Sequence, residues 1–174
     1  MTYLRALIFF GLAVSAFASA TLDALVNAAA SFSSAIQEQL EVVQSDPKPA
    51  KFAESTIAYA KAKTAYFHAL RVAMPELISV ATGKEARPPA VDKFAAAFSV
   101  AGEKQAIRAE YETRVLLDRF SWGSLRLQKA RAEFENAQKI EQGLRISMES
   151  TSLWNRSLYL FANHVFWIFI GPQS

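Results

Sequence analysis

Residues 124–149, SLRLQKARAEFENAQKIEQGLRISME, carry the clearest structural pattern in the chain. Apolar residues recur there at three- and four-residue intervals, which places them on one face of a helix. Charged residues occupy most of the other positions, so one face suits a core and the other suits water. The apolar face consists of Leu127, Ala130, Phe134, Ala137, Ile140, Leu144 and Met148.

Helical spacing extends from this stretch towards the N-terminus. Residues 21–44, 47–83, 90–102 and 103–120 each show it, and the alternation of a β-strand is hard to find anywhere. Asp46 is expected to cap the second helix, with Pro47 at its first position. Gly83 is expected to end that helix. The chain is therefore predicted to be all-α, with about five helices in an amphipathic bundle or an extended array. The apolar face of the second helix comprises Phe52, Ile57, Ala60, Phe67, Leu70 and Met74.

Charge is distributed unevenly over the first two of these helices. Residues 23–46 carry four acidic residues and no Lys or Arg, whereas residues 48–71 carry five basic residues and only Glu54 as an acid. An antiparallel hairpin would place these charges side by side, although surface pairs contribute only about 0–1 kcal/mol each. Three pairs within single helices have favourable spacing. They are Glu110–Arg114, Glu135–Lys139 and Glu141–Arg145.

The first 20 residues, MTYLRALIFFGLAVSAFASA, are apolar except for Arg5 near their start. They fit a secretory signal peptide cleaved after Ala20. They also fit an uncleaved anchor, because residues 4–22 would reach about 28 Å as a helix. Small residues recur every four positions, a spacing that allows another helix to approach closely. These are Gly11, Ser15 and Ser19. We adopt the anchor as the working prediction and keep cleavage as the alternative.

The C-terminal segment, residues 153–174, is the second apolar region. Its central 13 residues, 158–170, would span about 20 Å as a helix, which is too short to cross a bilayer upright. An exposed apolar patch of this size marks an interaction site. We therefore expect it to dock on a partner or lie in the membrane interface, with burial in the core as the alternative. The expected contact residues are Trp154, Tyr159, Phe166, Trp167, Phe169 and Ile170.

Motifs for chemistry are missing from the sequence. The chain has no cysteine, and its two histidines lack the spacing of zinc or di-iron ligands. The pairs Glu110/Glu112 and Glu133/Glu135 are two positions apart and diverge around a helix, which argues against paired-carboxylate catalysis. Nucleotide-binding glycine motifs and basic patches interleaved with aromatic residues are also missing. We predict no catalytic, cofactor or metal site and no nucleic-acid partner.

The sequence thus divides into a hydrophobic segment (1–20), a helical body (21–152) and a docking segment (153–174). With 174 residues, 52% of them hydrophobic, and a net charge of +3, the body can form one domain. We predict a non-enzymatic structural or accessory subunit of a membrane protein complex, favouring an organellar inner membrane. Its expected partners are membrane lipid and the other subunits of the complex. The alternative is a small secreted or periplasmic helical protein that binds an apolar ligand or surface.

Overall fold

The computed structural model describes the backbone of residues 2–120 and 123–153 and the side chains of residues 20–99, 101–120 and 123–148. Its helices are α1 (Thr2–Gln44), α2 (Pro49–Ala81), α3 (Pro89–Ala97), α4 (Val100–Arg119) and α5 (Leu125–Leu153). No strand occurs in these described ranges. The prediction of an all-α chain with about five helices is confirmed.

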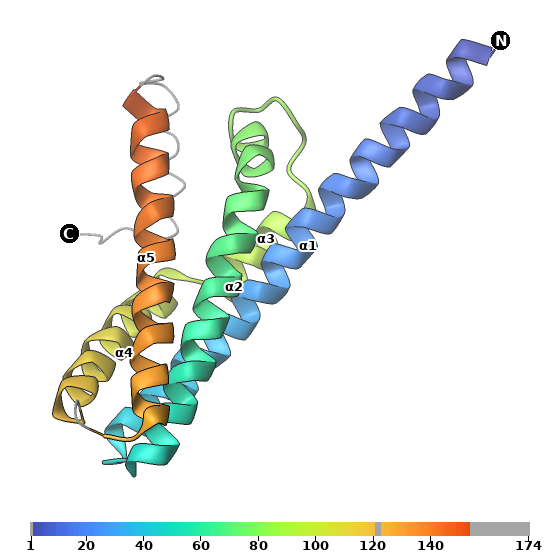
Figure 1. The fold of residues 1–174 in the computed structure, drawn as a ribbon. Coiled ribbons are helices and arrows are strands. Elements are labelled where there is room, and N and C mark those ends of the chain that lie inside the picture. Colours follow the sequence, from blue (N-terminus) through green and yellow to red (C-terminus); the bar gives the residue numbers. More distant parts are fainter. Residues whose placement is uncertain (1, 121–122, 154–174) are drawn as a thin grey trace.

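The long helices form a bundle (Figure 1). α2 packs against α1 and α5, and α1 also packs against α3 and α4. Arg131 of α5 donates hydrogen bonds to the carbonyl oxygen of Leu117 and to Asp118, which joins α5 to α4. In Figure 1, α1 and α4 run in one direction and α2 and α5 in the other. The predicted pairing of the first two helices is therefore present and antiparallel.

The inner face of the bundle follows alternating steps of three and four residues. This 3.5-residue average is typical of helices that pack at a shallow angle. Phe67 and Leu70 of α2 are buried, as are Phe134 and Leu144 of α5, and these two helices are in contact. The predicted burial of these four residues is confirmed, whereas Ile57, Met74, Ile140 and Met148 of the same apolar stripes are only partly buried. On α2 the buried inner row is Phe52, Thr56, Tyr59, Lys63, Tyr66, Leu70, Ala73 and Leu77.

The start of α2 differs from the prediction. Asp46 does not cap this helix: it adopts a left-handed conformation with φ of 48°, which Asp tolerates better than most residues. The helix begins two residues later than expected, with Pro49 in its first turn and Lys48 at the cap without a side-chain bond. Proline suits that position because the first amides of a helix have no partner within it. At the other end, Gly83 follows the helix with φ of 70°, as a terminating glycine should.

The sequence around residues 90–102 also folds differently from the expected single stretch. Phe98 leaves the helical conformation, and Ser99 begins α4 by accepting a hydrogen bond from the amide of Gly102 (3.4 Å). The break turns Phe98 into the core, where its ring lies 5.5 Å from Phe32 and 5.2 Å from Tyr66 between centroids. Burial of this aromatic ring accounts for an interruption that neither Gly nor Pro marks in the sequence.

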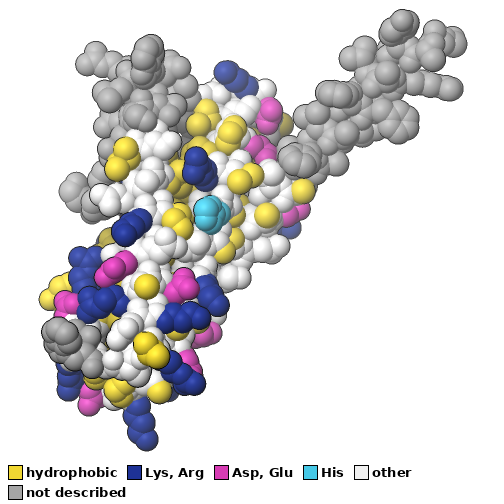
Figure 2. Space-filling model, viewed as in Figure 1, with side chains coloured by type: hydrophobic (Ala, Val, Ile, Leu, Met, Phe, Trp, Pro, Cys, Tyr) yellow, Lys and Arg dark blue, Asp and Glu magenta, His cyan; other side chains and the backbone are white. Residues whose placement is uncertain are grey.

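The charge asymmetry of α1 and α2 supports the pairing of these helices, but it does not lead to ion pairs between them in the described part of the chain. Asp46 instead pairs with Arg119 of α4, and Glu54 pairs with Arg126 of α5. On the face shown in Figure 2, charged side chains of both signs gather over the lower part of the bundle, around α4 and the start of α5.

Two of the predicted regions lie outside the described side chains. The first contains Gly11, Ser15 and Ser19. The second contains Trp154, Tyr159, Phe166, Trp167, Phe169 and Ile170. Among the residues whose side chains the structure describes, no helix combines the length and hydrophobicity needed to cross a bilayer. The anchor, the docking segment and their boundaries therefore remain predictions.

Candidate functional site

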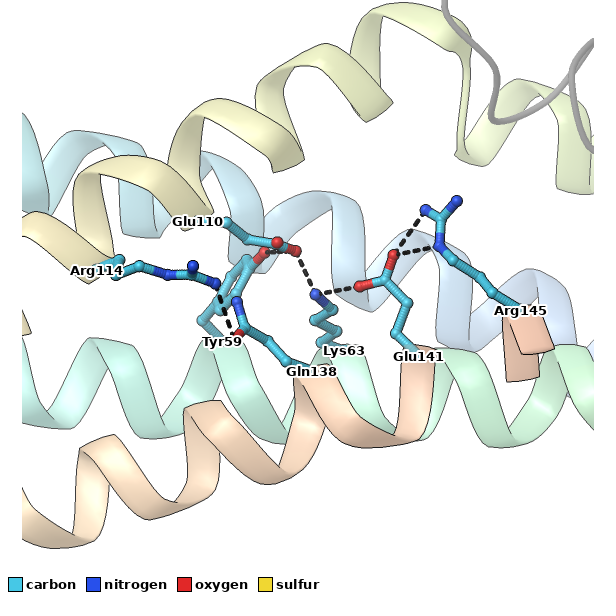
Figure 3. Close-up of polar contacts among 7 residues, drawn as sticks. All are labelled: Tyr59, Lys63, Glu110, Arg114, Gln138, Glu141 and Arg145. Carbon is cyan, nitrogen blue, oxygen red and sulfur yellow. Dashed lines mark hydrogen bonds and ion pairs between the residues drawn. The ribbon is translucent and has the colours of Figure 1, made fainter. Parts of the chain in front are cut away.

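A charged layer crosses the middle of the bundle and is centred on Lys63 of α2. This side chain is only 1% exposed. Its ammonium group forms an ion pair with Glu110 of α4 and a second one, of 2.5 Å, with Glu141 of α5 (Figure 3). A lysine is almost never this deeply buried unless it is paired. We call Lys63, Glu110 and Glu141, together with the flanking Tyr59 and Arg145, the charged layer.

The flanking residues extend the network in both directions. The Tyr59 hydroxyl donates a hydrogen bond to Glu110 (3.3 Å), and the Arg145 guanidinium holds one oxygen of Glu141 with two bonds of 2.7 and 2.9 Å. Glu110 and Glu141 remain 26% and 17% exposed, so both carboxylates reach towards water. The layer therefore joins α2, α4 and α5 through two positive and two negative side chains that pair with one another.

Of the three favourable pairs expected within single helices, Glu141–Arg145 forms in the structure. Glu110 bonds to α2 instead, and Arg114 donates to Gln138 of α5 at 3.0 Å. Glu110 and Arg114 thus each bond to a residue of another helix instead of to each other.

The ionisation of the carboxylates reflects this arrangement. Burial alone would raise the pKa of Glu141, but the neighbouring Lys63 and Arg145 outweigh it and lower that pKa below the ordinary value. Glu103 of α4 shows the opposite result: burial raises its pKa, and the repulsion of Glu141 adds to the rise against the attraction of Arg145. The surroundings thus stabilise the ionised form of Glu141 and destabilise the ionised form of Glu103.

Two buried tyrosines border the same region. Burial raises the pKa of Tyr59, and the nearby Glu110 and Glu141 raise it further. Burial is also the main reason that the pKa of Tyr66 is raised, and Glu103 is the largest electrostatic cause. The Tyr66 hydroxyl has no hydrogen-bond partner among the described residues. Both phenols therefore stay protonated at physiological pH.

A small cleft of about 50 Å³ opens beside these groups. Its lining includes Lys63, Tyr66, Glu103, Glu141 and Arg145. Small-molecule sites usually measure about 300–1,000 Å³, whereas a single water needs roughly 10–15 Å³. The cleft thus has room for a few waters, one of which could satisfy the Tyr66 hydroxyl.

A second, neutral polar layer crosses the bundle at the level of Gln39 of α1. Its side-chain nitrogen donates to the hydroxyls of Thr56 on α2 (3.2 Å) and Thr113 on α4 (2.8 Å). All three residues are completely buried, and the side-chain oxygen of Gln39 accepts no hydrogen bond from the part of the chain that the structure describes. We call these three residues the neutral layer. It joins α1, α2 and α4, whereas the charged layer joins α2, α4 and α5.

The chemistry open to the charged layer is limited by its pairing. An ammonium held between two carboxylates lacks the free electron pair that a nucleophilic or Schiff-base lysine needs. Within the described part of the chain, no group of three His, Cys, Asp or Glu side chains is placed to hold a metal ion. The arrangement is suited to fixing how three helices fit together, a role documented for single polar residues in helical seams.

Sequence reasoning missed this layer although part of the signal was present. Lys63 lies between Tyr59 and Tyr66 in the inner row of α2, a position that the spacing itself assigns to the interior. Glu110 and Glu112 diverge around their own helix, whereas Glu110 and Glu141 converge on Lys63 from two different helices. Comparison of the chain with family models, with curated proteins and with solved structures finds no match.

Proposed function

We propose that this protein is a non-enzymatic accessory subunit of a membrane protein complex, attached through the apolar segment at residues 1–20. The observation that carries the proposal is the continuity of α1, which runs from Thr2 to Gln44 without a break. Leu22 and Leu25 of this helix are buried in the bundle. A helix shared by anchor and core would hold the bundle at a fixed distance and orientation relative to the membrane.

The charged layer supports a structural role for the bundle. Lys63 is paired on both sides, and the cleft beside it is far smaller than a typical substrate site. α5 continues to Leu153, the first residue of the apolar C-terminal segment. In the proposal, that segment docks on another subunit or on the lipid interface, most naturally at an organellar inner membrane.

The anchor can be tested in the full chain with one charge. Leu12→Arg places a cation near the centre of residues 4–22, where insertion of an arginine costs about 2.5–3.5 kcal/mol. Asn27→Arg is the matched control, because Asn27 is exposed on the same helix within the bundle. We expect Leu12→Arg to shift the protein from the membrane fraction to the soluble fraction under alkaline extraction, and Asn27→Arg to leave it in place. Equal extraction of both variants and the parent chain would refute the anchor.

The secreted alternative rests on a separate observation. The hydroxyl of Thr21 donates a 2.6 Å hydrogen bond to Glu76 of α2, and Leu22 is the first buried residue among the described side chains of α1. Cleavage after Ala20 would leave this bond and the described core intact. The intact mass of the protein isolated from its native host separates the two functions. A chain that begins at Thr21 would support secretion, and a chain that retains residues 1–20 would support the anchor.

A further inference from the structure

A row of large apolar side chains lies uncovered on α4. Ile107, Tyr111 and Val115 are spaced one turn apart and are 61%, 68% and 46% exposed. They lie on the side of α4 opposite the buried Ala106, Ala109 and Thr113, so no other described part of the chain packs over them. Three such residues in two turns of one helix are characteristic of an interaction surface.

The charges along this row have a self-complementary order. Lys104, Tyr111 and Asp118 are seven residues apart and therefore share the exposed face, with a cation at one end and an anion at the other. Lys104 and Asp118 each lie seven residues from Tyr111, and Ile107 and Val115 each lie four residues from it. The row is therefore self-complementary when a second copy is placed antiparallel to it.

We propose that α4 pairs with α4 of a second copy of this chain, in an antiparallel arrangement with its two-fold axis at Tyr111. Each Ile107 then packs against Val115 of the other copy, and each Lys104 lies opposite the other Asp118. Such a contact closes on itself, as two-fold interfaces do. A parallel arrangement would place Lys104 against Lys104 and Asp118 against Asp118, which is repulsive.

The existing bond of Asp118 is compatible with this contact. Its Oδ1 accepts from Arg131 at 3.0 Å, and the residue remains 67% exposed, so the carboxylate can accept a further bond. A single pair of helix faces buries less than the roughly 1,600 Å² of a standard interface. We therefore expect a weak dimer that dissociates on dilution. Its association would be strengthened where the subunits are held close together, for example on the same membrane.

Cysteine cross-linking tests the proposed register, because the chain contains no cysteine. Tyr111→Cys places one thiol at the two-fold axis, and oxidation of the full chain should yield a covalent dimer. Ile107→Cys and Val115→Cys should each cross-link poorly alone, because residues of the same number lie about 12 Å apart along the axis. A mixture of these two variants should cross-link well.

Leu125→Cys is the control, because it is exposed on α5 away from the row. We expect Tyr111→Cys to form dimer roughly tenfold faster than this control at equal concentration, since a specific contact raises the local thiol concentration. Equal rates for the two variants would overturn the proposal. Efficient cross-linking by Ile107→Cys alone would overturn the antiparallel register.

A charge exchange provides an independent readout. Lys104→Glu should weaken the dimer in sedimentation equilibrium, and the double variant Lys104→Glu/Asp118→Lys should restore it, because the pair is rebuilt with its charges reversed. Failure of the double variant to recover association would contradict the pairing of Lys104 with Asp118. These experiments do not depend on membrane attachment, so they can succeed or fail separately from the proposed function.

Discussion

The neutral layer and the charged layer are both polar interruptions of the same helical seams, but they differ in depth. Gln39, Thr56 and Thr113 are completely buried and uncharged. Lys63 is equally buried, yet its partners Glu110 and Glu141 are partly exposed. Removing a charge from water costs much more than removing an amide or a hydroxyl. Lys63, the one buried cation among the described side chains, is thus paired with carboxylates that keep part of their hydration.

The largest loss of stability is expected from a substitution at Phe134, in the apolar core. The ring of Phe134 is buried on α5, 6.3 Å from that of Tyr59 between centroids. Phe134→Ala should lower the free energy of unfolding by about 3–5 kcal/mol, because it leaves a cavity in the core. Chemical denaturation measures this loss, with Leu125→Ala on the exposed side of α5 as the control. A midpoint that barely moves would mean that this part of α5 is not packed against the core.

The charged layer should be the more sensitive of the two layers. Lys63→Met preserves most of the side-chain volume but leaves Glu110 and Glu141 without their counter-charge. We expect a loss of about 1–3 kcal/mol at pH 7, less than for a fully buried pair because the carboxylates are partly hydrated. Lys61→Met, on the exposed side of α2, should have little effect.

The pH dependence of this loss follows from the lowered pKa of Glu141. A carboxyl with a lowered folded pKa stabilises the protein above its unfolded value, 4.5, and loses that contribution as the pH falls. The difference between Lys63→Met and the parent chain should therefore narrow below pH 4.5. A difference that stays constant with pH would show that the pairing of Lys63 with these carboxylates is not its source.

Substitution of Glu103 should change the free energy of unfolding in the opposite direction to substitution of Lys63, and by a smaller amount. Its folded pKa is raised, so its ionisation destabilises the protein as the pH rises through that value. Glu103→Gln removes the ionisation and should slightly increase the free energy of unfolding at pH 7, with no gain at a pH below 4.5. Thermal denaturation at the two pH values measures this. A destabilised variant at pH 7 would mean that the carboxylate makes a favourable contact.

The neutral layer should show the smallest effect. Gln39→Leu removes two hydrogen bonds but also removes the unpartnered side-chain oxygen, and the two threonine hydroxyls can bond to their own helices. We expect a change within about 1 kcal/mol that does not vary with pH. Gln37→Leu, on the exposed side of α1, is the control. A loss equal to that of Lys63→Met would remove the distinction between the layers.

How far the sequence predicts this molecule depends on the distance over which each feature is determined. The apolar stripe from Leu127 to Met148 is a local property, and the helix and its buried face followed from it. The break at Phe98 depends on rings from other helices and leaves only Ser99 as a local sign. The partner of Lys63 on α4 is 47 residues away, and helical spacing gives no information about which of several glutamates will meet it. Depth in the bundle, which separates the two layers, is likewise a tertiary property.

The order of the helices along the chain also sets the order in which a nascent protein can complete its charged layer. Lys63 and its hairpin partner α1 leave the ribosome first, and Glu110 on α4 follows. Glu141 lies on α5, the final helix to be synthesised among those described. A chain without α5 lacks one of the two carboxylates that pair with Lys63 and leaves one side of α2 uncovered. Apolar surface exposed in this way during synthesis is prone to aggregation. α5 covers that side of α2 and provides Glu141 as the second counter-charge. The charged layer can therefore be completed only after α5 has been synthesised.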